Sequence, residues 1–276
     1  LLVLILLTNL VFVTKSEDLP EWTFMVYLDG DNDLEKFAVD DFLELSSVGS
    51  TSDVNIIVQF DRGKPTNPTK DDKRYDDWTN SKRYKVTQGM TPTIANALED
   101  IGEVDMADPQ VLFEFLNWSA NKYEAKKYFL VIWNHGLGWE GIVKDDSSGG
   151  FMKTPELAEA LEQFYASKSK KIDVIAFDAC RMMIEMIYEM RNYAHYFVGS
   201  EKDVPDRGFP YNTLLSSMTS NPLVSASSAA KKLVDLYVSF YTSNTIFAVT
   251  LSSIKSSSLD DLRQRLSALI DETLLE

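Results

Sequence analysis

Residues 128–136 read YFLVIWNHG, and residues 172–180 read IDVIAFDAC. Each stretch opens with a mainly apolar run that is rich in β-branched and aromatic residues, and each run stops at residues that favour turns. This pattern is typical of the buried strands of a parallel sheet. Functional groups gather beyond the carboxyl ends of such strands, so we expect His135 and Cys180 to lie at the same edge of one sheet. An imidazole beside a thiol is the arrangement of a Cys/His dyad.

Segments typical of strands and of helices alternate along the rest of the chain. The pattern predicts strands at residues 22–28, 54–60, 84–88, 128–133, 172–177, 196–200 and 245–251, and helices at 34–45, 109–123, 154–166, 181–192, 226–242 and from 259 onward. Alternation of this kind is the signature of helices packed on both faces of a sheet. We therefore predict a three-layer α/β/α sandwich around a mostly parallel sheet.

The composition limits the classes of function. The 276 residues, 45% of them hydrophobic, are enough for one sizeable core without a second domain. A formal net charge of −15 argues against nucleic acid or an anionic membrane as a partner. A single cysteine excludes an internal disulfide framework and a cysteine-rich zinc site. Cys180 is therefore either a small buried hydrophobic residue or a reactive thiol.

The first thirteen residues are almost wholly apolar, and TKSED follows them. Such a run suits the apolar region of a secretory signal peptide and is short for a membrane span. We expect residues 1–16 to be part of a signal peptide or leader and the protein to be secreted, with a membrane anchor only if the leader stays uncleaved. Residues 17–276 then form one domain, and because the last predicted helix carries no end signal we expect that domain to continue further.

The residues around Cys180 and His135 suit nucleophilic catalysis. A helix predicted to start at Arg181 would lower the pKa of the Cys180 thiol through its dipole. His135 could act as general base, and the backbone N–H groups of Gly136 and Cys180 could stabilise an oxyanion. Without Cys180, His135 would be interpreted as a polar strand end. The other histidine, His195, precedes a predicted strand and is expected to be a solvated residue at the opposite edge.

Two other kinds of site fit these residues less well. A phosphatase needs a glycine-rich loop after its cysteine, whereas RMMIEM follows Cys180 here. Residues 29–33, DGDND, match the start of an EF-hand calcium loop, but Leu34 stands where glycine is needed and Asp40 where glutamate is needed. Capping of the following helix by Asp31 and Asp33 explains these acids more simply.

Four blocks of sequence together resemble the clostripain family of cysteine endopeptidases, which are relatives of the gingipains, legumains, separases and caspases. The blocks are YLDGDNDLE at 27–35, NHG at 134–136, DACRM at 178–182, and the segment 200–211 with Ser200, Glu201, Pro205, Gly208, Pro210 and Tyr211. They occur in the family's order and span residues 22–251. The resemblance implies a caspase-like α/β/α sandwich, cleavage after Arg or Lys in protein or peptide substrates, and a catalytic pair of His135 and Cys180 that forms an acyl-enzyme.

The same resemblance implies roles for nearby acidic residues. Asp178, two residues before Cys180, would line the S1 pocket for a basic side chain, and the alternative is that it caps the following helix. Asp206, with Asp203 nearby, would add a second carboxylate to that pocket.

The resemblance also bears on self-cleavage and on metal dependence. Family members often cut themselves after a basic residue beyond the catalytic histidine, and the nearest candidates are Lys144 and Lys153. The dyad requires no cofactor and no metal; calcium dependence occurs in some members, and the sequence leaves it open. The alternative function is a catalytically silent protein on the same scaffold that binds peptides or calcium.

Overall fold

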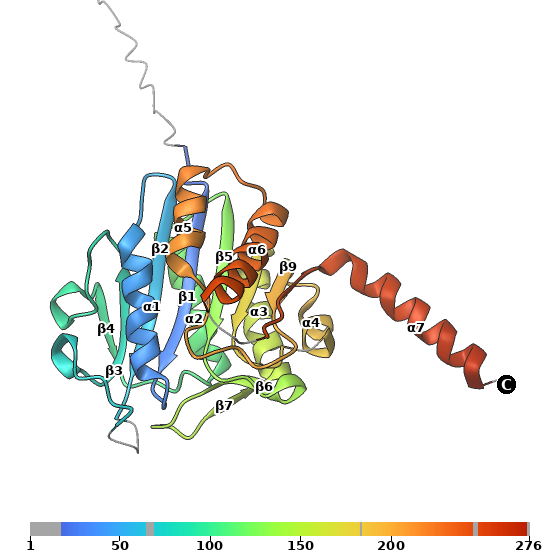
Figure 1. Ribbon diagram of the computed structural model, residues 1–276, viewed down its shortest axis with the longest axis horizontal. Coiled ribbons are helices and arrows are strands. Elements are labelled where there is room, and N and C mark those ends of the chain that lie inside the picture. Colours follow the sequence, from blue (N-terminus) through green and yellow to red (C-terminus); the bar gives the residue numbers. More distant parts are fainter. Residues whose placement is uncertain (1–17, 65–68, 183, 245–247, 275–276) are drawn as a thin grey trace, which may run out of the picture.

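One eight-stranded sheet, with helices on both faces, forms the body of the molecule (Figure 1). The computed structural model describes residues 18–64, 69–182, 184–244 and 248–274, so the predicted leader at residues 1–16 lies outside the described residues. The sheet order is β10-β9-β8-β5-β1-β2-β3-β4. Strands β9, β8, β5, β1 and β2 run parallel, and β10, β3 and β4 pair antiparallel at the two edges. The predicted three-layer α/β/α fold with a mostly parallel sheet is confirmed.

The strands of the large sheet are β1 (Trp22–Gly30), β2 (Val54–Arg62), β3 (Asn80–Lys85), β4 (Glu99–Gly102), β5 (Lys127–Trp133), β8 (Ile172–Asp178), β9 (Ala194–Gly199) and β10 (Ser252–Lys255). A separate hairpin consists of β6 (Gly141–Lys144) and β7 (Phe151–Lys153). The helices are α1 (Glu35–Val48), α2 (Pro109–Lys122), α3 (Thr154–Lys168), α4 (Ile184–Met190), α5 (Tyr211–Ser220), α6 (Ala226–Asn244) and α7 (Leu259–Leu274).

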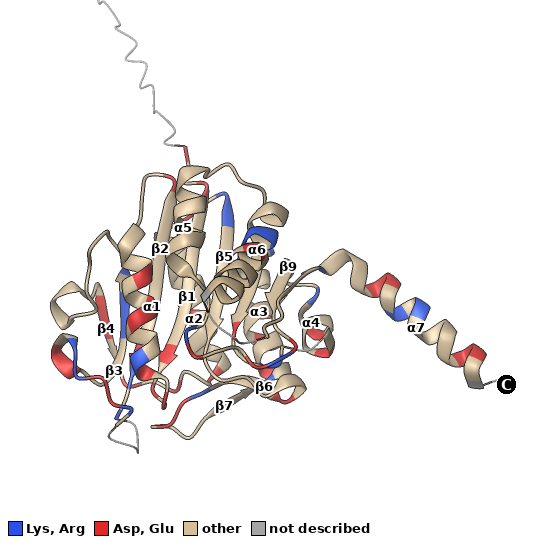
Figure 2. Ribbon diagram, viewed as in Figure 1, with Lys and Arg blue, Asp and Glu red and all other residues tan. Residues whose placement is uncertain are grey.

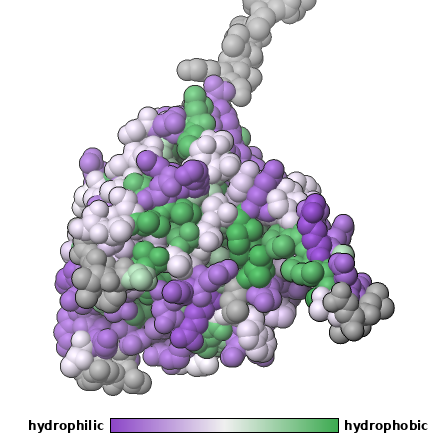
Figure 3. Space-filling view, turned by 45° about the vertical axis from the view of Figure 1, so that its right-hand side comes forward, coloured by the Kyte–Doolittle hydropathy of each residue, from purple (hydrophilic) through white to green (hydrophobic). Residues whose placement is uncertain are grey.

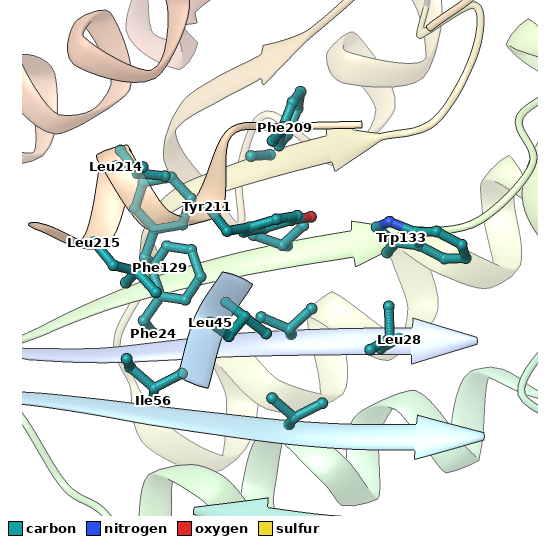
Figure 4. Close-up of a cluster of buried hydrophobic side chains, with 14 of the residues drawn as sticks. Phe24, Leu28, Leu45, Ile56, Phe129, Trp133, Phe209, Tyr211, Leu214 and Leu215 are labelled. Atoms are coloured by element: carbon teal, nitrogen blue, oxygen red, sulfur yellow. The ribbon is translucent and has the colours of Figure 1, made fainter. Parts of the chain in front are cut away.

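Alternating side chains of the central strands feed two separate cores. On β1, Phe24 and Leu28 pack under α1, α5 and α6, whereas Met25 and Tyr27 pack under α2, α3 and α4. Successive side chains of a strand point to opposite faces, so a continuously apolar strand is what a sheet covered on both faces requires. Figure 4 shows part of the first core, in which the Phe24 ring stacks on Phe129 of β5 at 4.8 Å between centroids.

The sequence was less informative at the sheet edges. The strand predicted at 84–88 is wrong in its bounds, because β3 spans Asn80–Lys85, and β4, β6, β7 and α5 were not predicted. The strand predicted at 245–251 is also misplaced: residues 248–251 are not in a strand, β10 begins at Ser252, and residues 245–247 lie outside the described residues. Edge strands are short and only half covered, so they lack the long apolar run that marks β1, β5 and β8.

The last helix stands apart from the body. Helix α7 extends away from the sheet and the other helices (Figure 1), and exposed apolar side chains lie along it: Leu262, Leu266, Leu269 and Ile270. With this side turned forward, Figure 3 shows hydrophobic patches separated by hydrophilic ones. Among the described residues, no helix is both long enough and apolar enough to span a membrane.

Candidate active site

His135 and Cys180 meet at the carboxyl ends of two neighbouring parallel strands. Trp133, the last residue of β5, pairs with Asp178, the last residue of β8. His135 and Cys180 each lie two residues beyond that pair, and both line a small cleft of about 60 Å³. The structure therefore brings together the two residues of the predicted dyad.

Gly136 allows the two strand ends to approach closely. A Cβ atom at Gly136 would lie only 2.1 Å from the carbonyl oxygen of Cys180. No side chain fits at that distance, so glycine is required for the backbone beside His135 to touch the backbone of the cysteine. Within the described part of the chain, the N–H groups of Gly136 and Cys180 donate to no other backbone group, which leaves both available to an oxyanion.

An acidic residue that the sequence analysis did not assign to the site holds the imidazole. Nε2 of His135 lies 2.8 Å from Oδ1 of Asp33, in the turn after β1. Burial acts to raise the pKa of Asp33, but the hydrogen bond and charge of His135 outweigh it, so the pKa is lowered. A carboxylate only accepts hydrogen bonds, so Nε2 is the donor, and the neutral tautomer that fits this contact has its lone pair on Nδ1.

The prediction that Asp31 and Asp33 cap helix α1 is wrong. The N-cap residue is Leu34, and no side chain makes a capping hydrogen bond there. Asn32 instead accepts the N–H of Leu34 over 2.9 Å. Asp33 is thus free to reach His135, and the signal that could have found it was the position of this turn beyond β1, the strand beside β5.

Asn134 fixes the backbone just before the histidine. Its side-chain amide donates to the carboxylate of Asp29 and, over 3.2 Å, to the carbonyl of Lys144. Its side-chain oxygen accepts the N–H of Lys144 over 3.0 Å. Asp29 and Asn134 are both buried, so these bonds tie the end of β5 to β1 and to the hairpin strand β6.

Cys180 is held by the segment that follows β9. The N–H of Val204 donates to Sγ over 3.3 Å. Burial raises the pKa of the thiol, although this hydrogen bond acts to lower it. The expectation that a helix dipole lowers the pKa of Cys180 is therefore wrong, because α4 begins at Ile184 rather than at Arg181 and has seven residues.

Asp178 lies buried beside the cysteine and lines the same cleft. Its carboxylate accepts the N–H of Phe209 over 2.9 Å and the hydroxyl of Tyr211 over 2.7 Å. Figure 4 shows the Tyr211 ring lying along β5, with its hydroxyl toward the strand's carboxyl end. Burial raises the pKa of Asp178 to about 7, even though these hydrogen bonds act to lower it. Both hydrogen-bond donors to Asp178 thus lie in the segment after Gly208, so the carboxylate holds that segment instead of capping helix α4.

Further carboxylates that the sequence analysis did not identify lie close to Asp178. Asp41 of α1 is buried and accepts the indole N–H of Trp133 over 2.7 Å. Burial and the charges of Asp178 and Glu44 raise the pKa of Asp41 well above its ordinary value. Of the described cations, Arg207 reaches Glu44 at 3.8 Å, and none forms an ion pair with Asp41 or Asp178. Carboxyl groups are therefore gathered beside the cleft, and no described cation pairs with Asp178 or Asp41.

The two acidic residues predicted near the pocket differ in their surroundings. Asp206 is exposed and lines the mouth of the cleft. Asp203 is paired with Arg181 over 2.8 Å and does not line the cleft. His195 is exposed at the amino end of β9, away from the dyad, as the sequence predicted.

Two wider grooves adjoin the cleft, one on the Cys180 side and one on the His135 side. One, of about 820 Å³, shares Val204, Pro205 and Asp206 with the cleft. The other, of about 520 Å³, is lined by His135 and Gly136 and continues along the β6–β7 hairpin. An extended chain lying across the dyad would have room on both sides.

This chain is similar to known cysteine proteases. The model of the clostripain family matches residues 26–275. Clostripain from Hathewaya histolytica is 28% identical over an alignment of 218 residues that covers 70% of this chain and 41% of the relative. The chain thus spans less than half the length of that protein.

Solved structures agree on the fold. A secreted C11 cysteine protease from Bacteroides thetaiotaomicron, in complex with an irreversible peptide inhibitor, superposes with a TM-score of 0.68 and 26% identity over 88% of this chain and 68% of that one. An inactive zymogen C11 protease from Parabacteroides distasonis superposes with a TM-score of 0.67 and 24% sequence identity, over 89% of this chain and 65% of that one. Because the family model matches nearly the whole chain and the strand-end geometry agrees with it, this chain belongs to the clostripain family.

Proposed function

We propose that this protein is a secreted cysteine endopeptidase that cleaves peptide bonds after Arg or Lys. The observation that carries the proposal is the buried carboxyl group of Asp178, which lines one cleft with the Cys180 thiol and the His135 imidazole and has the buried Asp41 close behind it. Family membership and the inhibitor complex of the Bacteroides thetaiotaomicron relative support peptide substrates.

Cys180 and His135 would divide the chemistry between them. His135 takes the thiol proton at Nδ1, since Nε2 is occupied by Asp33. The Cys180 sulfur then attacks the carbonyl carbon of the substrate, and the imidazolium donates its proton to the departing amine. Water hydrolyses the resulting thioester by the same route. Because burial raises the pKa of the thiol, the free enzyme holds a neutral thiol and needs His135 for activation.

Groups around the dyad would stabilise the charges that develop. The N–H groups of Gly136 and Cys180, which donate to no other described backbone group, would bind the oxyanion, and fixed backbone donors cost no reorganisation during the reaction. Asp33 keeps the imidazole ring in one orientation and stabilises its protonated form, which makes it a positioning residue.

The specificity would come from the carboxylates below the cleft. A guanidinium or ammonium that leaves water needs a paired carboxylate. Conversely, Asp178 and Asp41 are two buried acids that repel each other, and an entering cation relieves that repulsion. A neutral side chain relieves none of it, so a basic P1 residue is favoured.

The two grooves favour an endopeptidase. A substrate that occupies both would extend on either side of the bond being cut. Secretion is supported by the apolar run at residues 1–13 and by the description of the Bacteroides thetaiotaomicron relative as secreted.

The first prediction concerns the dyad. Cys180→Ala and His135→Ala should each remove most activity on a Lys or Arg peptide, and the double variant should be little worse, because the two residues act as one unit. His195→Ala is the matched control and should keep near-normal kcat/KM. A fully active Cys180→Ala protein would end the proposal.

The second prediction concerns Asp178. Asp178→Asn should lower kcat/KM for Arg and Lys substrates, because the substrate cation is then buried without its partner. The loss of transition-state stabilisation should be about 2–4 kcal/mol. Substrates with Gln at P1 should lose much less. Asp206→Asn, at the exposed mouth, should cost at most about 1 kcal/mol and only at low salt.

The pH dependence of this preference gives a sharper readout. Since the pKa of Asp178 is about 7, this carboxyl becomes protonated as the pH falls below that value and can no longer pair with a cation. The ratio of kcat/KM for Arg over Gln should therefore rise with pH through about 7 in the parent, and this rise should be much smaller in Asp178→Asn, where only Asp41 remains. Equal losses for both substrates at every pH would mean that Asp178 supports only the fold.

The third prediction concerns self-cleavage after Lys144 or Lys153. The segment between them contains an exposed turn, the kind of site that is readily cut. However, the N–H of Lys144 donates to Asn134 and that of Lys153 to Glu156, so local opening must precede cleavage. Intact mass should show a slow cut after one of these lysines, absent from Cys180→Ala; a permanently uncut, fully active chain would remove processing from the mechanism.

A further inference from the structure

Four carboxylates from four different segments converge outside the catalytic cleft. Asp31 follows β1, Asp61 lies near the end of β2, Glu103 follows β4 and Asp145 follows β6. One carboxylate oxygen from each lies within 4.8 Å of those of the other three. Figure 2 shows acidic segments around the arrowhead of β1, at the carboxyl end of the sheet.

Two of these carboxylates lack the partners that buried acids normally have. Asp61 is fully buried, and neither of its oxygens makes a hydrogen bond of ordinary length and geometry within the described residues; burial raises its pKa, and the nearby hydroxyl of Ser81 offsets only part of that rise. Oδ1 of Asp31 is buried and unpartnered in the same way. The described lysines and arginines form no ion pair with any of the four carboxylates.

The surrounding chain holds the cluster in place. A Cβ atom on Gly63 would lie 1.5 Å from Oδ1 of Asp31, so glycine leaves the space that this carboxylate fills. Asp145 accepts the N–H groups of Met106 and Ser148 over 2.9 and 2.8 Å. Backbone donors thus orient Asp145 while leaving lone pairs on its oxygens. A buried, unpartnered carboxylate such as Asp61 costs free energy unless a cation joins it.

We propose that Asp31, Asp61, Glu103 and Asp145 bind a calcium ion. An all-oxygen set of carboxylates suits a hard cation, whereas zinc prefers nitrogen and sulfur. Oxygens on opposite sides of Ca²⁺, each about 2.3–2.6 Å from it, lie roughly 4.6–5.2 Å apart, which matches the span of the cluster. Mg²⁺ binds at about 2.0–2.1 Å and keeps several waters, so it fits four protein carboxylates less well. Glu103 is exposed and marks the side from which the ion enters.

The site differs from an EF-hand. Of the DGDND segment, only Asp31 belongs to the cluster, because Asp29 binds Asn134 and Asp33 binds His135. The other ligands come from residues 30 to 114 positions further along the chain, which no spacing pattern could reveal. The segments meet because β1 and β2 are neighbours and the β6–β7 hairpin folds back over the end of β1.

Calcium would connect this cluster to the neighbouring active-site segments. Asp29 accepts the N–H of Asp31 over 3.0 Å and also the side-chain amide of Asn134, the residue before His135. Asp145 directly follows Lys144, a candidate for self-cleavage. A bound ion would therefore hold the start of the 145–150 segment and make cleavage after Lys144 slower.

The experiment measures calcium binding without using peptidase activity, so its outcome is independent of the proposed function. The parent is the full chain with Cys180→Ala, which prevents self-cleavage, freed of metal with EDTA and dialysed. Saturating CaCl₂, at about a hundredfold excess over Kd, should raise the Tm by roughly 5–10 °C. Calorimetry should show one site per chain, and MgCl₂ should raise the Tm much less.

Variants test which residues bind the ion. Asp61→Asn keeps the size of the side chain and should abolish the calcium-dependent rise, while its Tm in EDTA should be no lower than the parent's because a repelling charge is gone. Glu103→Gln, at an exposed position, should weaken Kd about tenfold (1.4 kcal/mol). Asp235→Asn, on the exposed side of α6, is the matched control and should behave as the parent does.

Three outcomes would overturn the proposal. The first is a parent that shows neither a Tm rise nor calorimetric heat with CaCl₂. The second is Asp61→Asn or Glu103→Gln binding calcium with the parent's affinity. The third is an equal Tm rise with MgCl₂, which would contradict the assignment to calcium.

Discussion

The parallel pairing of β5 with β8 is the constraint on which the rest of the site depends. Its register places Trp133 opposite Asp178, so the chain positions two residues later, His135 and Cys180, leave the sheet together. The absence of a side chain on Gly136 then lets the two backbones touch. Apolar burial on both faces stabilises these strands, and a slip by one residue would turn every core side chain to the wrong face. The geometry of the site is thus determined by the core rather than by the loops.

Buried carboxyl groups without a cation recur at this edge of the sheet. Asp178 lines the catalytic cleft with Asp41 close behind it, and Asp61 lies in the second cluster with Asp31. Buried acids without cations reduce the stability of a fold, and they are found where a ligand supplies the missing charge. On this account the two places await different cations: a substrate side chain that arrives and leaves with each turnover, and an ion that stays and holds the neighbouring segments. Part of the acidic composition is therefore organised into sites instead of being spread evenly over the surface.

The sequence predicted the features that depend on local patterns, and it did not predict those that depend on contacts between distant segments. The runs at β1, β5 and β8 are buried on both faces, so their composition alone indicated strands, and the residues that end them indicated the dyad. The start of α4 was predicted three residues too early, because the turn at Arg181, with a φ of 59°, has no clear sequence signal. Asp33, Asp41 and Val204 reach the site through tertiary contacts, and no local pattern marks them. From the sequence, the acids of DGDND are explained by one local feature, the start of helix α1. In the fold they have three different surroundings: Asp29 binds Asn134, Asp31 belongs to the carboxylate cluster and Asp33 binds His135.

The central claim is that Cys180 is a nucleophile beside a pocket for a basic side chain. The most direct measurement is covalent labelling of the folded protein with two peptidyl acyloxymethyl ketones that differ only in Lys or Gln at P1, followed by peptide mass mapping. The account predicts a single adduct on Cys180, formed much faster with the Lys reagent and lost in His135→Ala. Labelling at equal rates with both reagents, or no adduct on Cys180 in a folded protein, would contradict it.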